Sequence, residues 1–308
     1  MTKSSAAIVL ASIICLSGAA QSVRPEQPQT LDLTKVLGSE RLCAVGNGSV
    51  QFVNEDTLVL LAGSETNCYR AVQALELVTL KTDGRIVARK PWPSTFPFVA
   101  MDSRVVVGGV GNFFVLNDTL QTIQTLSLPT GERSSVFLQK EGTSTLLARL
   151  PRGETFAYSG VPLAEEKYQK TTSGDGTVLH RKSGEIVALR KKELLTVEPG
   201  GETRHLADLS WLQDCNSLCQ AWVSGIRLAV SANGERAAFV SGGTRFPITD
   251  DSGMFPFWRV LVVDLSNGKE VFRKEFATNI DRRCAQLSPA GDLLLLSDGD
   301  KLQFKSLP

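Results

Sequence analysis

The residue types that most often perform catalysis are sparse in this chain of 308 residues. The two histidines, His180 and His205, lie in polar, strand-like surroundings, and we interpret both as strand residues rather than acid–base catalysts. No Gly-X-Ser-X-Gly motif supplies the nucleophile turn of a serine hydrolase. The Gly-X-Gly pairs lack the third glycine of a dinucleotide-binding loop, and no Gly-Lys-Ser/Thr phosphate loop is present.

Two acidic clusters offer oxygen atoms that could bind a metal. Asp250 and Asp251 are adjacent, and Asp298 and Asp300 flank a glycine. Calcium takes about six to eight oxygen ligands, and neither spacing fits its usual binding loop of roughly twelve residues. We therefore interpret both clusters as solvated turns, and we expect no catalytic residue, no metal and no cofactor.

The segment Gly242–Trp258 holds the strongest candidates for binding. A regular hairpin connection needs about two to five residues, whereas this insertion between two strand-like runs has about seventeen. Its candidate binding residues are Arg245, Phe246, Phe255, Phe257 and Trp258. Aromatic and arginine side chains give much contact area at little entropic cost, which favours a binding surface. The alternative is that these aromatics fold back as a small core beneath the loop.

The N-terminus has the order of a secretory signal peptide. Lys3 precedes the apolar stretch Ala6–Leu16, and small residues follow through Ala20. Cleavage after Ala20 or after Ser22 would fit this pattern. A membrane anchor is the alternative, but a spanning helix needs roughly twenty apolar residues. We expect a secreted or periplasmic protein with no membrane span.

Five cysteines remain once residues 1–20 are removed: Cys43, Cys68, Cys215, Cys219 and Cys284. Disulfides persist in the oxidising compartments that exported proteins reach. Cys43 and Cys68 flank a predicted hairpin and could pair, and Cys215 and Cys219 could close a small loop unless their segment is helical. The odd number leaves at least one thiol outside these pairs. Metal binding by Cys215 and Cys219 is disfavoured because no third ligand stands at suitable spacing.

The charge of the mature chain is balanced. Removing residues 1–20 takes away one lysine and no acid, which leaves 32 basic and 32 acidic residues. A chain of mixed sign offers no general attraction to nucleic acid or to an anionic membrane. We expect a protein or peptide partner, no nucleic acid, and a monomer.

Short strands and turns dominate the chain from Leu42 onward. Hairpin dipeptides occur at Asp83–Gly84, Asn233–Gly234 and Asn267–Gly268. The only segment with a helical pattern lies at 206–222, where Ser210 and Gln213 are spaced as a capping box. We expect at most one short helix there. Trp211 and Trp222 flank the pair Cys215 and Cys219, and we expect them to anchor that insertion rather than to bind a ligand.

A strand–turn–strand unit recurs near the C-terminus. It reads VSANGERAAFVSG from Val230 and LSPAGDLLLLSDG from Leu287. Recurring units of this kind bury their apolar faces by stacking on their neighbours. At roughly 40–45 residues per four-stranded blade, the chain predicts an all-β propeller of six blades, with seven as the alternative. The six predicted blades cover 44–94, 95–131, 132–170, 171–209, 210–278 and 279–308.

The last predicted blade has only three strands, so a propeller would need a fourth from elsewhere. The segment Leu31–Leu37 is placed to supply it and to close the ring. The predicted organisation is a signal peptide over 1–20, an N-terminal segment with the closing strand over 21–41, and a propeller domain over 42–308.

The two recurring units, together with WRVLVVDLSNGKEVFRKEF from Trp258, resemble the repeats of TolB-like and WD-repeat β-propellers. The resemblance covers residues 226–308, although the chain has no Trp-Asp blade ending. It implies a propeller fold and, as the commonest use of such repeats, a binding or scaffolding role.

These observations predict an exported, non-catalytic binding module for a protein or peptide. The alternative is a propeller enzyme, a lactonase-like hydrolase or a quinone-dependent dehydrogenase, with its site in the central channel. Such a site needs carboxylates and amides from several blades to converge, and sequence spacing cannot show this convergence.

Overall fold

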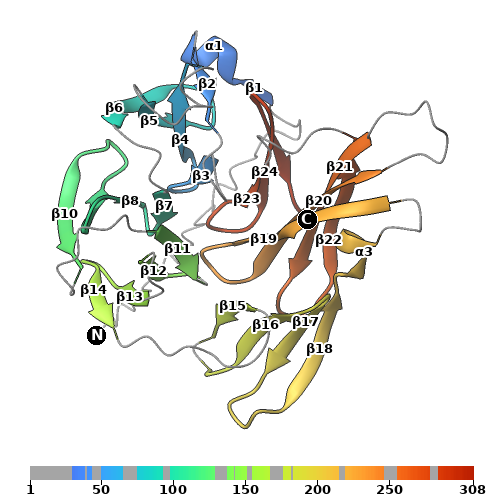
Figure 1. Cartoon of the computed structure of the whole chain (residues 1–308). Helices are drawn as coiled ribbons and strands as arrows, with labels where there is room; N and C mark the ends of the chain where they lie inside the picture. Colours follow the sequence, from blue (N-terminus) through green and yellow to red (C-terminus); the bar gives the residue numbers. More distant parts are fainter. Residues whose placement is uncertain are drawn as a thin grey trace, which may run out of the picture.

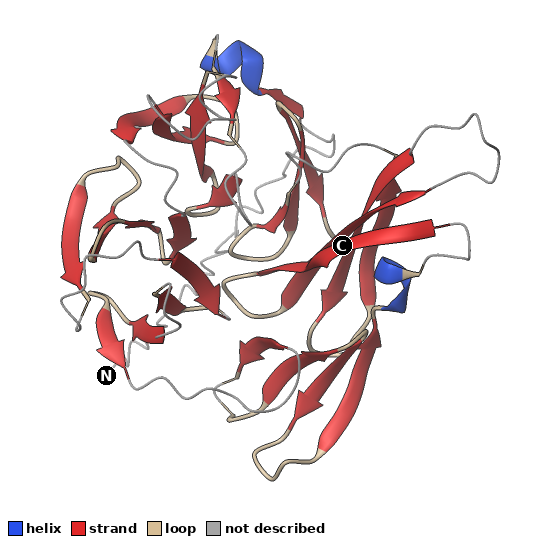
Figure 2. Ribbon diagram, in the orientation of Figure 1, coloured by secondary structure: helices blue, strands red, loops and turns tan. Residues whose placement is uncertain are grey.

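A computed structural model of the chain describes residues 30–38, 40–43, 50–64, 75–92, 98–128, 137–141, 143–150, 155–166, 176–181, 183–214, 219–245, 255–277 and 284–308. At a few strand ends only the backbone is described. Strands dominate these residues, and the helices are short (Figure 2). The predicted signal peptide lies outside the described residues.

Six antiparallel sheets, here called blades 1 to 6, are arranged around a centre (Figure 1). Blade 1 contains β2 (Arg41–Leu42), β3 (Val50–Phe52), β4 (Thr57–Gly63), β5 (Leu75–Lys81) and β6 (Ile86–Trp92). Blade 2 contains β7 (Phe98–Met101), β8 (Arg104–Gly108), β9 (Asn112–Leu116) and β10 (Thr122–Ser127). Blade 3 contains β11 (Phe137–Glu141), β12 (Thr145–Arg149), β13 (Thr155–Ser159) and β14 (Ala164–Glu166).

The other three blades follow in chain order. Blade 4 contains β15 (Gly176–His180), β16 (Ile186–Arg190), β17 (Glu193–Val197) and β18 (Thr203–Asp208). Blade 5 contains β19 (Cys219–Val230), β20 (Arg236–Arg245), β21 (Phe255–Asp264) and β22 (Glu270–Phe276). Blade 6 contains β23 (Ala285–Leu287), β24 (Leu293–Asp298), β25 (Lys301–Ser306) and β1 (Thr30–Asp32). The predicted six-bladed propeller is confirmed, and the alternative of seven blades is wrong.

The N-terminal segment closes the ring as predicted, but over fewer residues. Strand β1 pairs antiparallel with β25, with Thr30 opposite Gln303. The prediction of a strand through Leu37 is wrong, because the helix α1 (Leu33–Leu37) begins directly after β1. The Asp32 carboxylate accepts a hydrogen bond from the backbone nitrogen of Thr34 at 3.0 Å and so caps this helix. Leu33 and Leu37, one turn apart, are both buried against the core shared by blades 6 and 1.

The propeller has two faces, because neighbouring strands run in opposite directions. We call one the short-turn face: it carries the connections from first to second and from third to fourth strands, such as Asp102–Ser103 in blade 2 and Gly160–Leu163 in blade 3. The opposite one, here called the arm face, carries α1, α3 (Ser210–Gln213) and the connection between β20 and β21. The two faces therefore present different types of connection.

The recurring sequence unit forms the first turn of blade 5 and of blade 6, on the short-turn face. In each copy the glycine nitrogen donates to the serine carbonyl, Gly234 to Ser231 at 3.0 Å and Gly291 to Ser288 at 2.9 Å. The two turns touch, since the Asn233 side-chain amide donates to the carbonyl of Ala290 at 2.8 Å. The unit was recognisable because each copy needs the same small and polar residues to close the same turn.

The core consists of apolar side chains between neighbouring blades. Separate buried clusters join blade 1 to blade 2, blade 2 to blade 3, blade 4 to blade 5, blade 5 to blade 6, and blade 6 to blade 1. At these five boundaries, neighbouring blades bury apolar surface against each other, as in other repeat folds.

The short helix predicted within 206–222 is present as α3, but the predicted capping box is wrong. The backbone nitrogen of Ser210 donates to the Asp208 carboxylate at 2.7 Å, and the Ser210 hydroxyl donates to the same group at 3.0 Å. Asp208 therefore fixes the start of the turn, while the N-cap residue Leu209 makes no side-chain cap. Within the described part of the chain, no helix is long and apolar enough to cross a membrane.

Candidate functional site

The predicted long loop of blade 5 is in large part an extended hairpin. Strands β20 and β21 stay paired through Gly242 opposite Trp258 as far as Arg245 opposite Phe255. The interpretation of 242–258 as a single loop is therefore wrong, and only the nine residues 246–254 lie between the described strands. We call residues 242–258 the arm. Its described parts, the end of β20 and the start of β21, lie at the upper right of Figure 1.

Strand β19 accompanies the arm along one side. Cys219 lies opposite Arg245 and Ser224 opposite Gly242, with register shifts between these positions. The three long strands of blade 5 have twelve, ten and ten residues, against two to seven in the other blades. Main-chain pairing on both sides of β20 explains why two glycines, poor strand formers, are still held in an extended strand.

The five predicted binding residues are divided between the tip and the base of the arm. Arg245 and Phe255 face each other across the last described pair of the ladder. Their side chains, and the whole of Phe246, lie outside the described residues. Phe257 and Trp258 are at the base and are buried, with 3% and 1% of their surface exposed. These two aromatics are therefore packed in the interior, as in the alternative interpretation of a small core beneath the loop.

Each buried aromatic of the arm packs on a different side of blade 5. The Trp258 ring stacks on Phe276, with ring centroids 4.4 Å apart, in the cluster between blades 5 and 6. The Phe257 ring lies 4.9 Å from the Arg259 guanidinium carbon. Alternation along β21 sends neighbouring residues to opposite faces, so the base of the arm is held from both sides.

Arg259, which the sequence analysis did not single out, fixes the base of the arm to α3. Its side chain is 8% exposed, and its Nε donates to the Glu275 carboxylate at 2.8 Å. Its Nη1 donates to the carbonyl of Trp211 and to the carbonyl of Asp214, the latter at 2.6 Å. A charged residue inside the apolar run FWRVLVV was the signal that could have revealed it, since buried charges require partners.

Trp211 lies in α3 and contacts two arginines of blade 5. Its ring lies between two guanidinium groups, Arg259 at 5.1 Å and Arg273 at 4.2 Å from the ring centroid. Such contacts between a cation and an aromatic face are attractive. The second predicted anchor, Trp222, has a side chain outside the described part of the structure.

The two histidines and the aspartates of the acidic clusters do not form a shared site among the described residues. His180 ends β15, His205 lies in β18, and both are exposed. The Asp300 carboxylate accepts from the Leu42 nitrogen at 3.3 Å, and its carbonyl accepts from the Leu33 nitrogen at 2.7 Å. Asp300 thus helps to hold the ring closure, while Asp250 and Asp251 lie outside the described residues. Among the residues that the structure describes, no group of three or more His, Cys, Asp or Glu side chains converges on a metal site.

The cysteines are only partly described. Cys43 is buried at 1% exposure, and its nitrogen donates to the carbonyl of Leu61 at 2.8 Å. Cys68 and Cys215 lie outside the described residues, as does the side chain of Cys219. Cys284 is a buried thiol whose sulfur lies 3.9 Å from the carbonyl of Val50.

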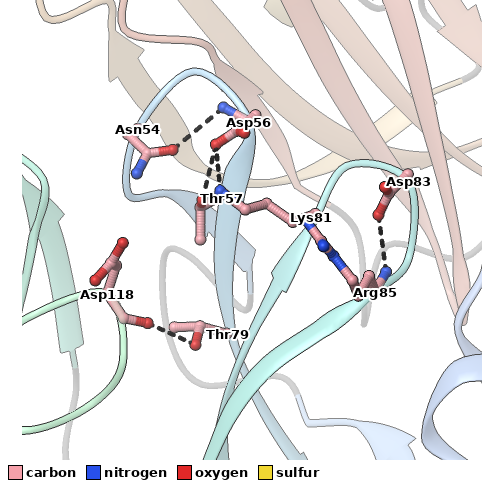
Figure 3. Close-up of polar contacts among 8 residues, drawn as sticks. All are labelled: Asn54, Asp56, Thr57, Thr79, Lys81, Asp83, Arg85 and Asp118. Carbon is pink, nitrogen blue, oxygen red and sulfur yellow. Dashed lines mark hydrogen bonds and ion pairs between the residues drawn. The ribbon is translucent and has the colours of Figure 1, made fainter.

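The short-turn face carries a rim of polar contacts that connects hairpins. In blade 1 the Lys81 ammonium donates to the Asp56 carboxylate at 2.8 Å and to the Thr57 hydroxyl at 2.9 Å (Figure 3). The hydrogen bond from Lys81 lowers the pKa of Asp56 below its ordinary value. The buried hydroxyl of Thr79 donates to the carbonyl of Asp118 in blade 2 at 2.7 Å.

Three arginines extend this rim from one blade to the next. Arg104 of blade 2 donates to the carbonyl of Gly160 in blade 3 at 3.0 Å. Arg181 of blade 4 donates to the carbonyl of Leu265 in blade 5. Arg236 of blade 5 donates in blade 6 to the carbonyl of Gly291, at 2.9 Å, and to that of Pro308. On the short-turn face, each of these arginines therefore connects its own blade to the blade that follows it in the chain.

Comparison with known proteins finds no matching family model and no matching curated protein. Among solved structures, the chain is similar to the β-propeller domain of Cps50 (Swd1) from Myceliophteria thermophila, at 10% identity, over 92% of this chain and 100% of that one, with a TM-score of 0.42. It is similar to the WD40 repeats of RRP9, at 9% identity, over 92% and 100% of the chains, with a TM-score of 0.44. It is also similar to BBS1N, solved in complex with ARL6DN, at 14% identity, over 87% and 94%, with a TM-score of 0.43.

The protein is a six-bladed β-propeller, a class defined by its own sheets and their closure. A shared propeller fold does not specify function, which depends on the site.

Proposed function

We propose that this protein is an exported, non-catalytic propeller that binds a protein or peptide partner through its arm. The observation that carries the proposal is the continuation of β19, β20 and β21 beyond the rest of blade 5. At about 3.3 Å per strand residue, the four paired rows from Gly242 to Arg245 reach roughly 13 Å along the arm. An extended hairpin on a rigid disc is suited to reach a surface that the disc cannot contact.

The base of the arm supports this role because it is already ordered. Arg259 connects β21 to α3 and to β22, and Trp258 is stacked in the core beside it. A binding element whose base is held in place loses less conformational entropy when it meets a partner. The sequence of the tip, with Phe246, Met254 and Phe255, offers apolar and aromatic groups for a pocket on that partner.

We also infer that residues 1–20 are removed on export and that Cys43 and Cys68 form a disulfide. The position of Cys43 beside Leu61 of β4 supports this pairing, since Cys68 follows the end of that strand by five residues. Mass spectrometry of the secreted protein should find a mature N-terminus at Gln21 or Val23. A peptide map without reduction should contain Cys43 joined to Cys68. An intact N-terminus in the cytoplasm would contradict export.

The arm can be tested without disturbing its base. Because Arg245 and Phe255 are opposite each other, residues 246–254 can be replaced by Asn-Gly, which closes a two-residue hairpin. The control variant carries a Ser-Gly-Ser insertion after Gly200, in an open turn on the short-turn face. Both variants should keep the melting temperature and circular dichroism of the wild type.

Partner capture is then compared among the three proteins. Each is used as bait in the exported fraction of the producing cells, and captured proteins are quantified by mass spectrometry. We expect the wild type and the Gly200 variant to retain the same partner, and the shortened arm to lose it at least about tenfold, or about 1.4 kcal/mol. Equal capture by the shortened arm would show that the arm is not the binding surface. The monomeric state that we propose is checked by light scattering.

A further inference from the structure

A second group of polar side chains lies between blades 2 and 3 at the short-turn face, on the side of the propeller opposite the arm. We call Asp102, Arg104, Lys140 and Tyr158 the interblade cluster. Asp102 lies in the turn between β7 and β8, and Arg104 begins β8. Lys140 lies in β11 and Tyr158 in β13. None of these residues belongs to the arm or contacts its base.

Arg104 connects the two halves of the cluster. Its side chain is 6% exposed, and its Nη2 donates to the Asp102 carboxylate at 3.1 Å. The same nitrogen donates to the carbonyl of Gly160 at 3.0 Å, just beyond the end of β13. The guanidinium of blade 2 is therefore held beside the strand of blade 3 that carries Tyr158.

Lys140 and Tyr158 lie on the same side of blade 3, facing blade 2. Both are register partners of Leu146 in the strand between them, so the three residues form one cross-strand row. The Tyr158 ring meets Phe113 of blade 2 edge to face, with centroids 4.9 Å apart. The Asp102 carboxylate attracts the Lys140 ammonium across the same boundary.

Two donors of the cluster have no acceptor within the described structure. The Nε of Arg104 and the hydroxyl of Tyr158 are buried without a hydrogen-bond partner among these residues. Burial lowers the pKa of Lys140, although attraction by Asp102 acts in the opposite direction. Burial also raises the pKa of Tyr158 to about 12, with the Glu165 carboxylate acting in the same direction. Unsatisfied buried donors are costly, so their presence in one place requires an explanation.

We propose that the interblade cluster is a binding site for an oxyanion, a carboxylate or a phosphate. Arg104 and Lys140 lie near the Asp102 carboxylate, and the exposed Glu165 carboxylate lies opposite Tyr158 on β14. The buried donors without an acceptor, and not the net charge, therefore indicate an anion. One oxyanion has enough lone pairs to accept from both the Arg104 Nε and the Tyr158 hydroxyl, and the Lys140 ammonium, on the same side of blade 3 as Tyr158, would add positive charge. The site is at the solvent boundary, because the Asp102 side chain is 32% exposed and nearby Val161 is 76% exposed. This site is independent of the partner proposed for the arm.

The cluster makes a prediction that distinguishes a ligand site from a purely structural network. Tyr158→Phe removes a buried donor without an acceptor, and Lys140→Met removes a cation whose charged form is disfavoured by burial, so each variant should keep or raise the melting temperature of the anion-free protein. Both variants should nevertheless weaken anion binding. A structural network would behave in the opposite way, because loss of any member would lower the melting temperature.

The experiment is a titration of the full mature protein with inorganic phosphate and, separately, with succinate, at constant ionic strength set by chloride. Isothermal calorimetry should detect one site in the wild type for at least one of the two anions, and the anion that binds identifies the class. Tyr158→Phe and Lys140→Met should each weaken it at least about tenfold, or about 1.4 kcal/mol. Lys140→Arg, which keeps the charge, should retain binding, and Lys192→Met on exposed blade 4 surface should change nothing.

Asp102→Asn should change the affinity for the anion in the opposite direction. It removes the only carboxylate of the cluster, and asparagine tolerates the positive φ of 49° at this turn position. We expect it to tighten anion binding several-fold. If neither anion binds the wild type, or if all variants bind as the wild type does, the proposal is wrong.

Discussion

Replacement of Arg259 by methionine tests whether the base of the arm is held by one buried cation. The substitution keeps an unbranched apolar stem of similar length but removes the hydrogen bonds to Glu275, Trp211 and Asp214. The two carbonyls lose a donor, and the Glu275 carboxylate, 27% exposed, loses its counter-charge. The loss in free energy of unfolding of this variant therefore measures the cost of leaving these acceptors without a donor.

The size of the effect follows from these contacts. Breaking a fully buried ion pair costs about 3–5 kcal/mol, and the partial exposure of Glu275 places this case at the low end, at about 3 kcal/mol. For a domain of this size, about 3 kcal/mol corresponds to a fall of roughly 6–12 °C in melting temperature. Arg259→Lys keeps the charge without the planar fork, so we expect it to recover about half of the loss.

The assay is differential scanning calorimetry, with limited proteolysis to locate any loosened segment. Arg273→Met is the matched control, because Arg273 also contacts Trp211 but is 44% exposed and lies 3.5 Å from Glu270. Exposed ion pairs contribute roughly 0–1 kcal/mol. In Arg259→Met, cleavage should begin in the arm and in the segment after α3. A melting temperature within about 2 °C of the wild type would refute the reasoning, since the contacts would then be worth no more than those of Arg273.

Three further predictions concern the ring and its turns. Gly268→Ala should lower the free energy of unfolding, measured in urea, by at least about 3 kcal/mol, because the added Cβ would lie 1.8 Å from the carbonyl oxygen of Leu206. The control Gly201→Ala has a similar φ but open space around it, and should cost about 1 kcal/mol. Leu33→Ala should cost about 2–5 kcal/mol at the ring closure, because Leu33 is fully buried, and hydrogen exchange should rise in β1 and β25. Because burial raises the pKa of Tyr158 to about 12, its ionisation is unfavourable in the folded state, and the wild type should lose about 2 kcal/mol of stability as the pH rises from about 10 to 12. Urea midpoints of the wild type should therefore fall over that range relative to Tyr158→Phe.

The blade pattern was predictable because turns in this chain require particular residues. Asp83–Gly84, Asn233–Gly234 and Asn267–Gly268 all lie in turns, each with its glycine at positive φ. Only the glycine has positive φ in these pairs, as in a type I turn followed by a left-handed residue, rather than in the two-residue hairpin of the prediction. The two-residue form occurs at Asp102–Ser103, where both φ values are positive and no glycine marks the turn.

The arm and the closing segment were harder to predict because their conformation depends on distant partners. Gly242 and Gly243 have low strand propensity, and only the ladder to Trp258 and Phe257 makes them a strand. In LDLTKVL, apolar residues fit both an alternating strand and a helical turn. The choice is made by the cap between Asp32 and Thr34, which stops β1 after three residues.

The interblade cluster was invisible in the sequence for a related reason. Lys140 is 38 residues beyond Asp102, and neither residue has an unusual neighbour in the chain. Their meeting depends on the angle between two blades, which no local pattern encodes. Arg259 differs, because an arginine inside an apolar strand already indicates a buried partner.

The contacts that join neighbouring blades lie on the short-turn face, away from the tip of the arm, and this explains how the sequence of the tip can vary. Arg104, Arg181 and Arg236 join neighbouring blades on the short-turn face, and β1 closes the ring at the edge of blade 6. None of these contacts involves residues 246–254. A change at the tip of the arm therefore leaves the contacts of the ring intact, whereas a change at Arg259 acts on both the arm and the fold. Selection for a new partner would act at the tip, with the base and the short-turn face held fixed by the stability of the ring.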